Sequence, residues 1–204
     1  MLARCRLVGS HSRAEADRPA VPAVGPLRRP GTPLPERRPG ALTLQEAAAQ
    51  ADALAGEGKE RELADLRREW EDEVEGAARS PDYRERAVAY RAIGQFRFRQ
   101  KIELLARGLD DESPACRGSA LISLELLSRD GPGAVNTVRS DLHRLASSDD
   151  NQAVRRLAIV CLKNGPAHRD TISLLEGLAD DDRQERELQD TAGKVAAALK
   201  KKGR

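Results

Sequence analysis

Aromatic residues are scarce in this chain: two Tyr, two Phe and one Trp occur among 204 residues. A core with so few rings must be built from Leu, Ala, Val and Ile on many short helices. Hydrophobic residues make up only 39% of the chain and charged residues 33%, which favours a thin core in an elongated stack of helices. Val and Ile are too sparse, and alternating patterns too rare, for a β protein.

Long apolar runs are also missing. No run approaches the roughly 18–20 residues that cross a membrane, and the first residues, MLARCRLV, lack the apolar stretch of a signal peptide. The cysteines, Cys5, Cys116 and Cys161, lack metal-site spacing and leave one thiol over in any disulfide scheme. Cys116 and Cys161 fall on apolar helix faces, where buried free thiols are ordinary. We therefore expect a reducing, cytoplasmic location.

Catalytic and metal-binding motifs are missing too. His11, His143 and His168 are far apart, and none has a second ligand at i+3 or i+4. Cys161 and His168 are separated by a helix break at Asn164–Pro166. There is no phosphate-binding glycine loop and no nucleophile elbow. The sequence therefore provides no catalytic residue, cofactor or metal site, and it favours a protein that is not an enzyme.

Charge is unevenly distributed. Residues 1–41 carry eight arginines and three acids, and residues 194–204 carry five bases and no acid, a net of +5 in each segment. Since the whole chain has a formal charge of +2, residues 42–193 carry −8. A body this acidic argues against nucleic acid as a partner. The lysines Lys200–Lys202 close the last helix, where cations complement the helix dipole.

Residues 1–41 contain seven prolines interleaved with arginines. Such a segment cannot bury enough surface to offset its ordering entropy, so we predict a disordered leader. Two alternatives stay open. The Arg-rich start, free of acids up to Glu15, has features of a transit peptide, and PLRRPGTPLP could present a polyproline ligand.

Residues 42–80 predict two helices. The first has Thr43 as N-cap, Glu46 at the capping-box position and Gly56 as its stop. The second, about Lys59–Arg79, carries one narrow apolar stripe. This stripe covers about two heptads, which is too short to establish a coiled coil. We predict that this pair caps the following domain.

From Pro81 the chain becomes periodic. Four helices share a phase, with spacings of 31, 38 and 34 residues between equivalent positions: Arg86, Arg117, Arg155 and Gln189. Partner helices with their own apolar stripes lie between them: Ile102, Leu105 and Leu109; Val138, Leu142 and Leu145; Ile172, Leu175 and Leu178. Breaks fall at Asp130–Gly133 and Asn164–Pro166. Spacings of this size predict stacked helical hairpins, because a single hairpin cannot bury both of its faces.

The pattern of A-helix leucines, an acidic turn and a V-R-x-x-A start of the B helix resembles HEAT repeats, including the short bacterial type. The resemblance covers about residues 81–200. It implies an all-α, HEAT-like α-solenoid of about three to four hairpins over residues 81–204. The capping helices 42–80 and the disordered leader 1–41 would precede it.

In HEAT-like proteins an Asp in the turn and an Arg six residues later form a polar ladder between repeats. Asp111–Arg117 and Asp149–Arg155 match both residue types and the spacing. The outer units depart, with Ser80–Arg86 and Arg183–Gln189 at the corresponding positions. We interpret the acidic turns as helix caps and ladder members rather than metal ligands. They are Asp110–Glu112, Asp149–Asp150 and Asp180–Asp182.

The resemblance also implies that the B helices line a concave face on which partners dock. Off the motif on that face lie the candidate partner-binding residues: Arg91, Ile122, Arg156, Val160, Lys163 and Lys194. An apolar strip with a basic rim suits a peptide or helix from a protein partner. The competing interpretation is that Ile122 and Val160 are further core. We predict a monomeric, non-enzymatic scaffold that binds a protein.

Two other functions come from HEAT-like relatives. Some are DNA glycosylases with a basic concave face, aromatic residues and a catalytic Asp. Stacking on bases needs rings, and within the repeats rings occur only in the first unit: Tyr83, Tyr90, Phe96 and Phe98. Others are lyases that attach bilin chromophores, and no residue of this sequence specifically favours that activity. Both stay alternatives to protein binding.

Overall fold

The computed structural model describes residues 42–203, which contain helices and turns and no strand. The α-helices are α1 (Leu44–Gly56), α2 (Glu60–Ala77), α3 (Tyr83–Gln95), α4 (Ile102–Leu109), α5 (Pro114–Ser128), α6 (Gly133–Thr137), α7 (Arg139–Ser148), α8 (Gln152–Leu162), α9 (Arg169–Asp180) and α10 (Arg186–Lys202), with a 3-10 turn η1 (Arg99–Lys101). The all-α prediction is confirmed for this part of the chain. The predicted leader, with Cys5 and His11, lies outside it. None of the described helices is both long and apolar enough to cross a membrane.

The first helix begins at the predicted capping box. The amide of Glu46 donates to Thr43 Oγ1 at 3.2 Å, and the amide of Thr43 donates to the Glu46 carboxylate at 2.8 Å. This reciprocal pair satisfies two backbone N–H groups that the helix cannot satisfy itself. The apolar stripe of α2 is also present, with Leu63 and Val74 fully buried. Both helices pack against α3.

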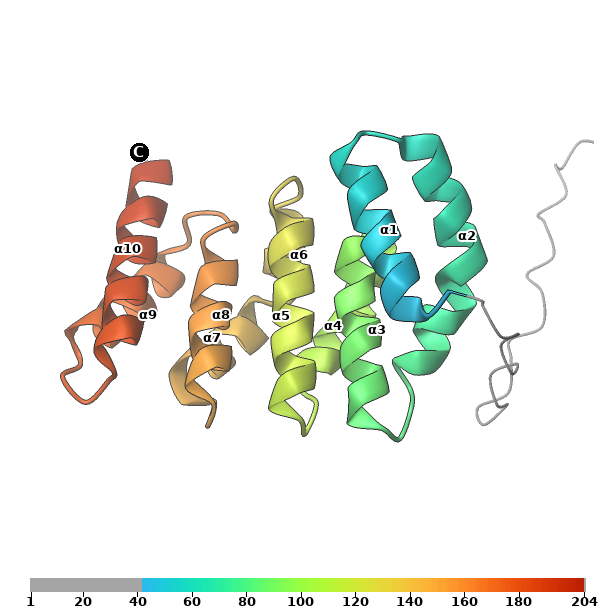
Figure 1. The fold of residues 1–204 in the computed structure, drawn as a ribbon. Helices are drawn as coiled ribbons and strands as arrows, with labels where there is room; N and C mark the ends of the chain where they lie inside the picture. The colour runs from blue at the N-terminus through green and yellow to red at the C-terminus, as the bar shows by residue number, and fades with distance from the viewer. Residues whose placement is uncertain (1–41, 204) are drawn as a thin grey trace, which may run out of the picture. The chain divides into compact units, whose positions relative to one another are not determined.

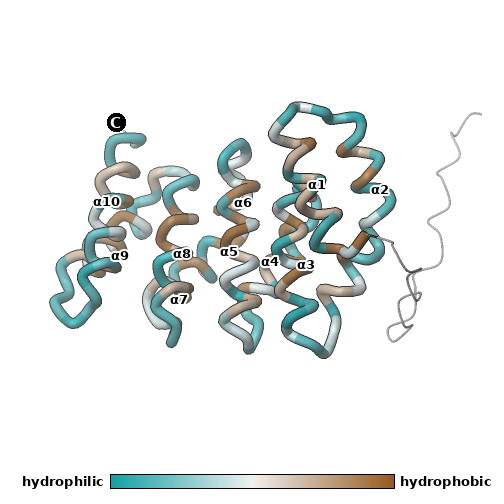
Figure 2. Tube along the Cα trace, viewed as in Figure 1, coloured by the Kyte–Doolittle hydropathy of each residue, from teal (hydrophilic) through white to brown (hydrophobic). Residues whose placement is uncertain are grey.

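From Tyr83 onward the helices form two layers (Figure 1). The B helices α3, α5, α8 and α10 pack on one another in chain order, and α4, α7 and α9 form the second layer behind them. The apolar residues gather on the inner sides of the helices (Figure 2). The fully buried side chains there include those of Leu105, Leu121, Leu142, Ile159 and Leu175. Each hairpin thus shares its core with the next one.

Small residues let neighbouring B helices approach closely. Ser123 Oγ on α5 donates to the carbonyl of Tyr90 on α3 at 2.6 Å, and Cys161 Sγ on α8 lies 3.1 Å from the carbonyl of Leu121 on α5. Ser123 and Cys161 are 38 residues apart, so the same contact recurs in successive units. The prediction that Cys161 is a buried free thiol is confirmed. Burial raises the pKa of this thiol, which keeps it protonated.

Basic residues tie the α3–α4 connection to α1 and α2. Arg97 has a φ of +58°, and its guanidinium donates to the carbonyl of Gly94 and pairs with Asp52 of α1 at 2.9 Å. Lys101 is only 7% exposed and lies between Glu71 and Glu75 of α2, at 2.7 and 2.6 Å. The charged helix α2 is therefore held by ion pairs to a buried lysine as well as by its apolar stripe.

The second predicted break packs against the short helix that follows the first one. The break at Asp130–Gly133 is shorter than expected, because Gly133 begins the short helix α6, which buries Val135. Val138 lies at the junction of α6 and α7 rather than within the stripe of α7. A Cβ at Gly165, in the second break, would lie 2.7 Å from Val135 Cγ1. Only a glycine leaves room for this contact.

A Gly94→Ala substitution should destabilise the protein by about 1–3 kcal/mol, as overpacking of a core does. The added Cβ would lie 2.5–2.8 Å from atoms of Ser123 on the neighbouring helix. Gly177→Ala in α9 is the matched control, because nothing lies within 4 Å of its Cβ. It should stabilise by up to about 1 kcal/mol through helix propensity. Urea unfolding followed by circular dichroism measures both, and equal effects would contradict the close contact of α3 and α5.

Stability should also fall as the pH drops below about 6.5, because of His143. Its Nε2 lies 2.9 Å from Thr171 Oγ1 of α9. Burial lowers the pKa of His143, as do Arg139 and His168, against an opposing effect of Asp170. The unfolded chain therefore takes up the proton first, which favours unfolding.

The measurement is the urea midpoint at several pH values between about 7.5 and 5.5, a window above the titration of the carboxylates. His143→Gln retains a polar group beside Thr171 and cannot titrate, so its midpoint should change less with pH. A variant as sensitive to pH as the parent protein would assign the effect to another group.

Candidate functional site

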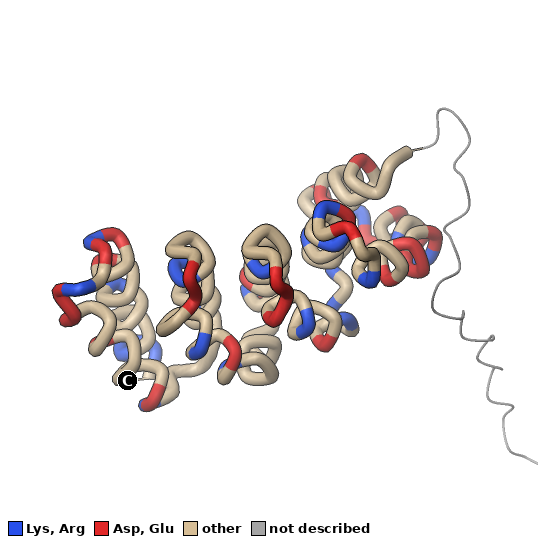
Figure 3. Tube along the Cα trace, turned by 90° about the horizontal axis from the view of Figure 1, so that it is seen from below, with Lys and Arg blue, Asp and Glu red and all other residues tan. Residues whose placement is uncertain are grey.

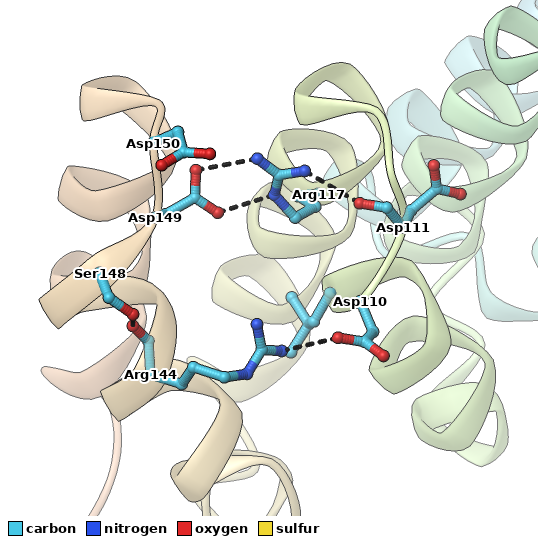
Figure 4. A pocket seen from close by; sticks show the side chains of 8 residues that line it. Asp110, Asp111, Arg117, Arg144, Ser148, Asp149 and Asp150 are labelled. Atoms are coloured by element: carbon cyan, nitrogen blue, oxygen red, sulfur yellow. Dashed lines mark hydrogen bonds and ion pairs between the residues drawn. The ribbon is translucent and has the colours of Figure 1, made fainter.

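Bidentate Arg–Asp pairs join the turns at the N-terminal ends of helices α3, α5 and α8, and Figure 4 shows the pair of Arg117 with Asp149. Arg86 donates through Nε and Nη2 to Asp111 at 2.7 and 2.9 Å, and Arg117 donates to Asp149 at the same distances. Nη1 of each arginine also donates to a carbonyl of its own turn: Arg86 to that of Ser80, and Arg117 to that of Asp111. Each arginine therefore connects its own turn to the next one with a rigid, charge-assisted fork.

The turn carboxylates also shape the turns. Asp111 accepts from the amide of Ser113 at 2.9 Å, and Asp149 from the amide of Asn151 at 2.8 Å. These acids accept a backbone N–H at the start of each helix, as expected, but they stand two residues before the N-cap residues and are not themselves N-caps. Asn151 itself caps α8. The hydrogen bonds from Arg86 lower the pKa of Asp111, so this carboxylate stays charged at neutral pH.

Arg155 does not continue the row, contrary to the prediction from its spacing. Its side chain is buried and donates to the carbonyl of Ala146 in its own hairpin at 3.0 Å. Within the described residues its Nη2 has no hydrogen-bond partner. The next turn carboxylate, Asp181, instead accepts from Arg183 at 2.8 Å and from Gln184 at 2.7 Å. These local donors satisfy Asp181 in place of Arg155.

In the outer repeat units, the residues at the turn and ladder positions also differ from those predicted from the sequence. Asp181, not Arg183, occupies the turn position of the last unit, because it accepts from the amide two residues later as Asp111 does. Gln189 then donates to the carbonyl of Asp181, as the arginines do in their own turns. The loop before α10 is two residues longer than the loop before α8, so Gln189 lies eight rather than six residues after Asp181. At the other end Arg86 does form a full pair, although Ser80 replaces the aspartate in its own turn.

A polar pocket of about 260 Å³ lies between the turns that precede α5 and α8 (Figure 4). Its lining includes the Arg117–Asp149 pair and a second pair, Arg144 with Asp110, at 3.1 Å. Nowhere in residues 42–203 do three His, Cys, Asp or Glu side chains stand where they could hold a metal ion. The pocket is thus lined by the Arg–Asp pairs that join neighbouring turns, and most of its charged side chains are already paired with one another.

Five of the six predicted partner-binding residues lie on the B helices, and Lys163 follows α8 as its C-cap residue. Four of them occupy equivalent positions, since their spacings of 31, 38 and 34 residues repeat those of the ladder position: Arg91 on α3, Ile122 on α5, Val160 on α8 and Lys194 on α10. Because these helices pack side by side in this order, the four residues form a line across the face. We call it the B-face line.

The middle of the B-face line is apolar and partly open. Ile122 and Val160 are half-buried, so part of each side chain reaches solvent. Leu126, one helical turn beyond Ile122, is half-buried as well. It had not been predicted, although its i+4 relation to Ile122 places both on one side of α5. Together they make an apolar strip over α5 and α8.

The cations around the strip differ in their pairing. Arg156 forms an ion pair with Glu187 of α10, so it joins two helices rather than remaining free for a partner. Among the described residues, Arg91, Lys163 and Lys194 form no hydrogen bond or ion pair through their side chains. The accessible basic rim therefore consists of these three residues.

No protein-family model matches this chain, and no curated protein matches it either. The function is therefore inferred from the geometry of the described residues.

The buried Arg117–Asp149 pair should contribute far more to stability than an exposed pair. The side chains are 14% and 4% exposed, so Asp149→Ala and Arg117→Ala should each cost about 3–5 kcal/mol, and the double variant less than their sum. The Arg156–Glu187 pair, in which Glu187 is 74% exposed, is the control, with a coupling below about 1 kcal/mol. Double-mutant cycles from urea unfolding measure both. Additive costs at Arg117 and Asp149 would show that the fork is not a coupled unit.

Proposed function

We propose that residues 81–203 form a HEAT-like α-solenoid that acts as a non-enzymatic scaffold and docks a protein partner on the exposed face of its B helices. The B-face line carries this proposal. Its four members recur at one position of every unit, yet they take no part in the ladder or the fully buried core. Residues that follow the repeat but do not stabilise it are available for a partner.

The chemistry of the strip supports a protein ligand. Apolar side chains left partly open on a strongly charged surface mark interaction sites. Ile122, Leu126 and Val160 form such a group, and cations border it. An apolar centre with a polar rim is the usual arrangement of protein–protein interfaces. Burying the three side chains would supply the affinity, and the cations would select and orient the partner.

The aromatic residues do not support base stacking. Tyr90, Phe96 and Phe98 are at most 3% exposed, and Phe96 and Phe98 stack on each other inside the first unit. Single-stranded nucleic acid is held by rings that present an open face. Of the four rings within the repeats only Tyr83 is exposed. The glycosylase-like alternative therefore gains no support from this surface.

The test is affinity capture with the full chain and an Arg156→Glu/Val160→Asp variant, followed by quantitative mass spectrometry. The variant places charge in the strip and should lose most of the recovery of a specific partner. Arg169→Glu/Ser173→Asp is the matched control. It makes the same charge change at the same i, i+4 spacing on exposed positions of α9, in the other layer.

Thermal melts establish that both variants are folded. Recovery of every partner at the parent level by a folded Arg156→Glu/Val160→Asp variant would contradict docking on the B helices. Equal loss by the α9 control would assign the effect to charge in general rather than to this face.

A further inference from the structure

We propose, on the basis of the function proposed above, that the segment bound by the B helices is an extended peptide with two apolar residues between two carboxylates. The pattern is acid-x-x-apolar-x-x-apolar-x-x-acid. It crosses α3, α5, α8 and α10 with one contact residue per helix. The juxtaposition that carries the inference is the B-face line, which reads cation, apolar, apolar, cation across the four neighbouring helices.

The spacing of the line sets the period of the ligand. Packed helices lie about 8–10 Å apart, so the line from Arg91 to Lys194 spans about 24–30 Å and presents one side chain every 8–10 Å. A polyproline II segment advances about 9 Å in each three-residue turn. Residues i, i+3, i+6 and i+9 of such a segment therefore fall opposite the four members of the line.

The width of the apolar strip favours an extended segment over a helix. On α8, Val160 has Arg156 one turn before it and Asn164 one turn after it, while Leu157 packs against the core and lies toward Gly118 of α5, so Val160 is the single apolar side chain in this row of α8. An amphipathic helix needs a wider apolar surface, since its own apolar stripe covers 100° or more. An extended peptide inserts one side chain at a time. It also loses little entropy on binding when it is rich in proline.

The charges select acidic ends. Arg91 stands at one end of the line and Lys194 at the other, and Lys163 follows Val160 by three residues as the C-cap of α8. All three are without an ion pair inside the described part of the chain. A carboxylate beside each end would meet an unpaired cation, whereas a basic residue there would meet a like charge. Arg91 is already half-buried, so its pairing with a ligand would be screened less than that of a fully exposed residue.

The probe is a fluorescently labelled ten-residue peptide, EPPLPPLPPE, titrated with the full chain and followed by fluorescence anisotropy. Saturable binding is expected. Replacing both glutamates by lysine should weaken it at least about tenfold. Inserting one proline between the leucines should also weaken it, because the second leucine then falls out of phase with Val160.

A charge-reversed protein provides the decisive comparison. Arg91→Glu/Lys194→Glu should invert the preference and bind KPPLPPLPPK more tightly than the glutamate peptide. The matched control is Arg107→Glu/Arg169→Glu, which makes the same charge change at exposed positions of α4 and α9. It should keep the parent preference.

Three results would overturn the inference. They are no saturable binding of EPPLPPLPPE, equal binding of the two end-charge peptides, and an unchanged preference in the charge-reversed protein. Tighter binding of a helix-forming peptide with the same four residues at seven-residue intervals would overturn the extended conformation, since a helix advances about 10 Å in seven residues. If the strip variant still lost its captured partner, the proposed function would stand and only the ligand chemistry would fail.

Discussion

The bidentate Arg–Asp fork is the interaction on which the arrangement of the hairpins depends. One guanidinium satisfies a carbonyl of its own turn and both oxygens of the next turn's carboxylate, so it sets the distance and rotation between units. Farther along the same helices, the Ser123 and Cys161 contacts set the approach of the B helices. Two fixed points at each of the α3–α5 and α5–α8 interfaces leave little freedom for a third. Arg91, Ile122 and Val160 therefore align across the face, and Lys194 on α10 continues this line in sequence position.

The interface between α8 and α10 is built differently, with consequences for the site. Asp181 is held by its own loop, so Arg155 turns inward and the buried fork is absent. In its place the exposed pair Arg156–Glu187 joins the two helices. A screened, exposed pair stabilises an interface far less than a buried fork. We infer that the α9–α10 hairpin is the less firmly held end of the row, and that Arg156 contributes to this junction more than to partner selection.

Sequence predicted those features that are decided locally. The capping box of Thr43 and Glu46 needs only a four-residue window, and the apolar spacing of the helices needs only their own turns. What it missed depends on distant groups or on loop length. Burial of Lys101 requires Glu71 and Glu75 from another helix, and Asp181 was passed over because a longer loop breaks the six-residue spacing. Pairing of Arg156 with Glu187 was likewise invisible, because it joins residues 31 positions apart.

The net charge of residues 42–193 does not describe the surface around the B-face line. The acidic excess of residues 42–193 includes the turns, seen as red segments at the ends of the hairpins in Figure 3, where the fork requires carboxylates. Val160 lies eight residues beyond Gln152, the first residue of α8, or about 12 Å along the helix, and Asp149 lies in the turn before that helix. That separation exceeds the Debye length of roughly 8 Å at physiological ionic strength. The turn acids are therefore largely screened from the B-face line. Among the charges close to the line, Arg156 and Glu187 pair with each other, while Arg91, Lys163 and Lys194 form no ion pair within residues 42–203, so the acidic excess of the body does not by itself oppose the acidic ligand proposed above.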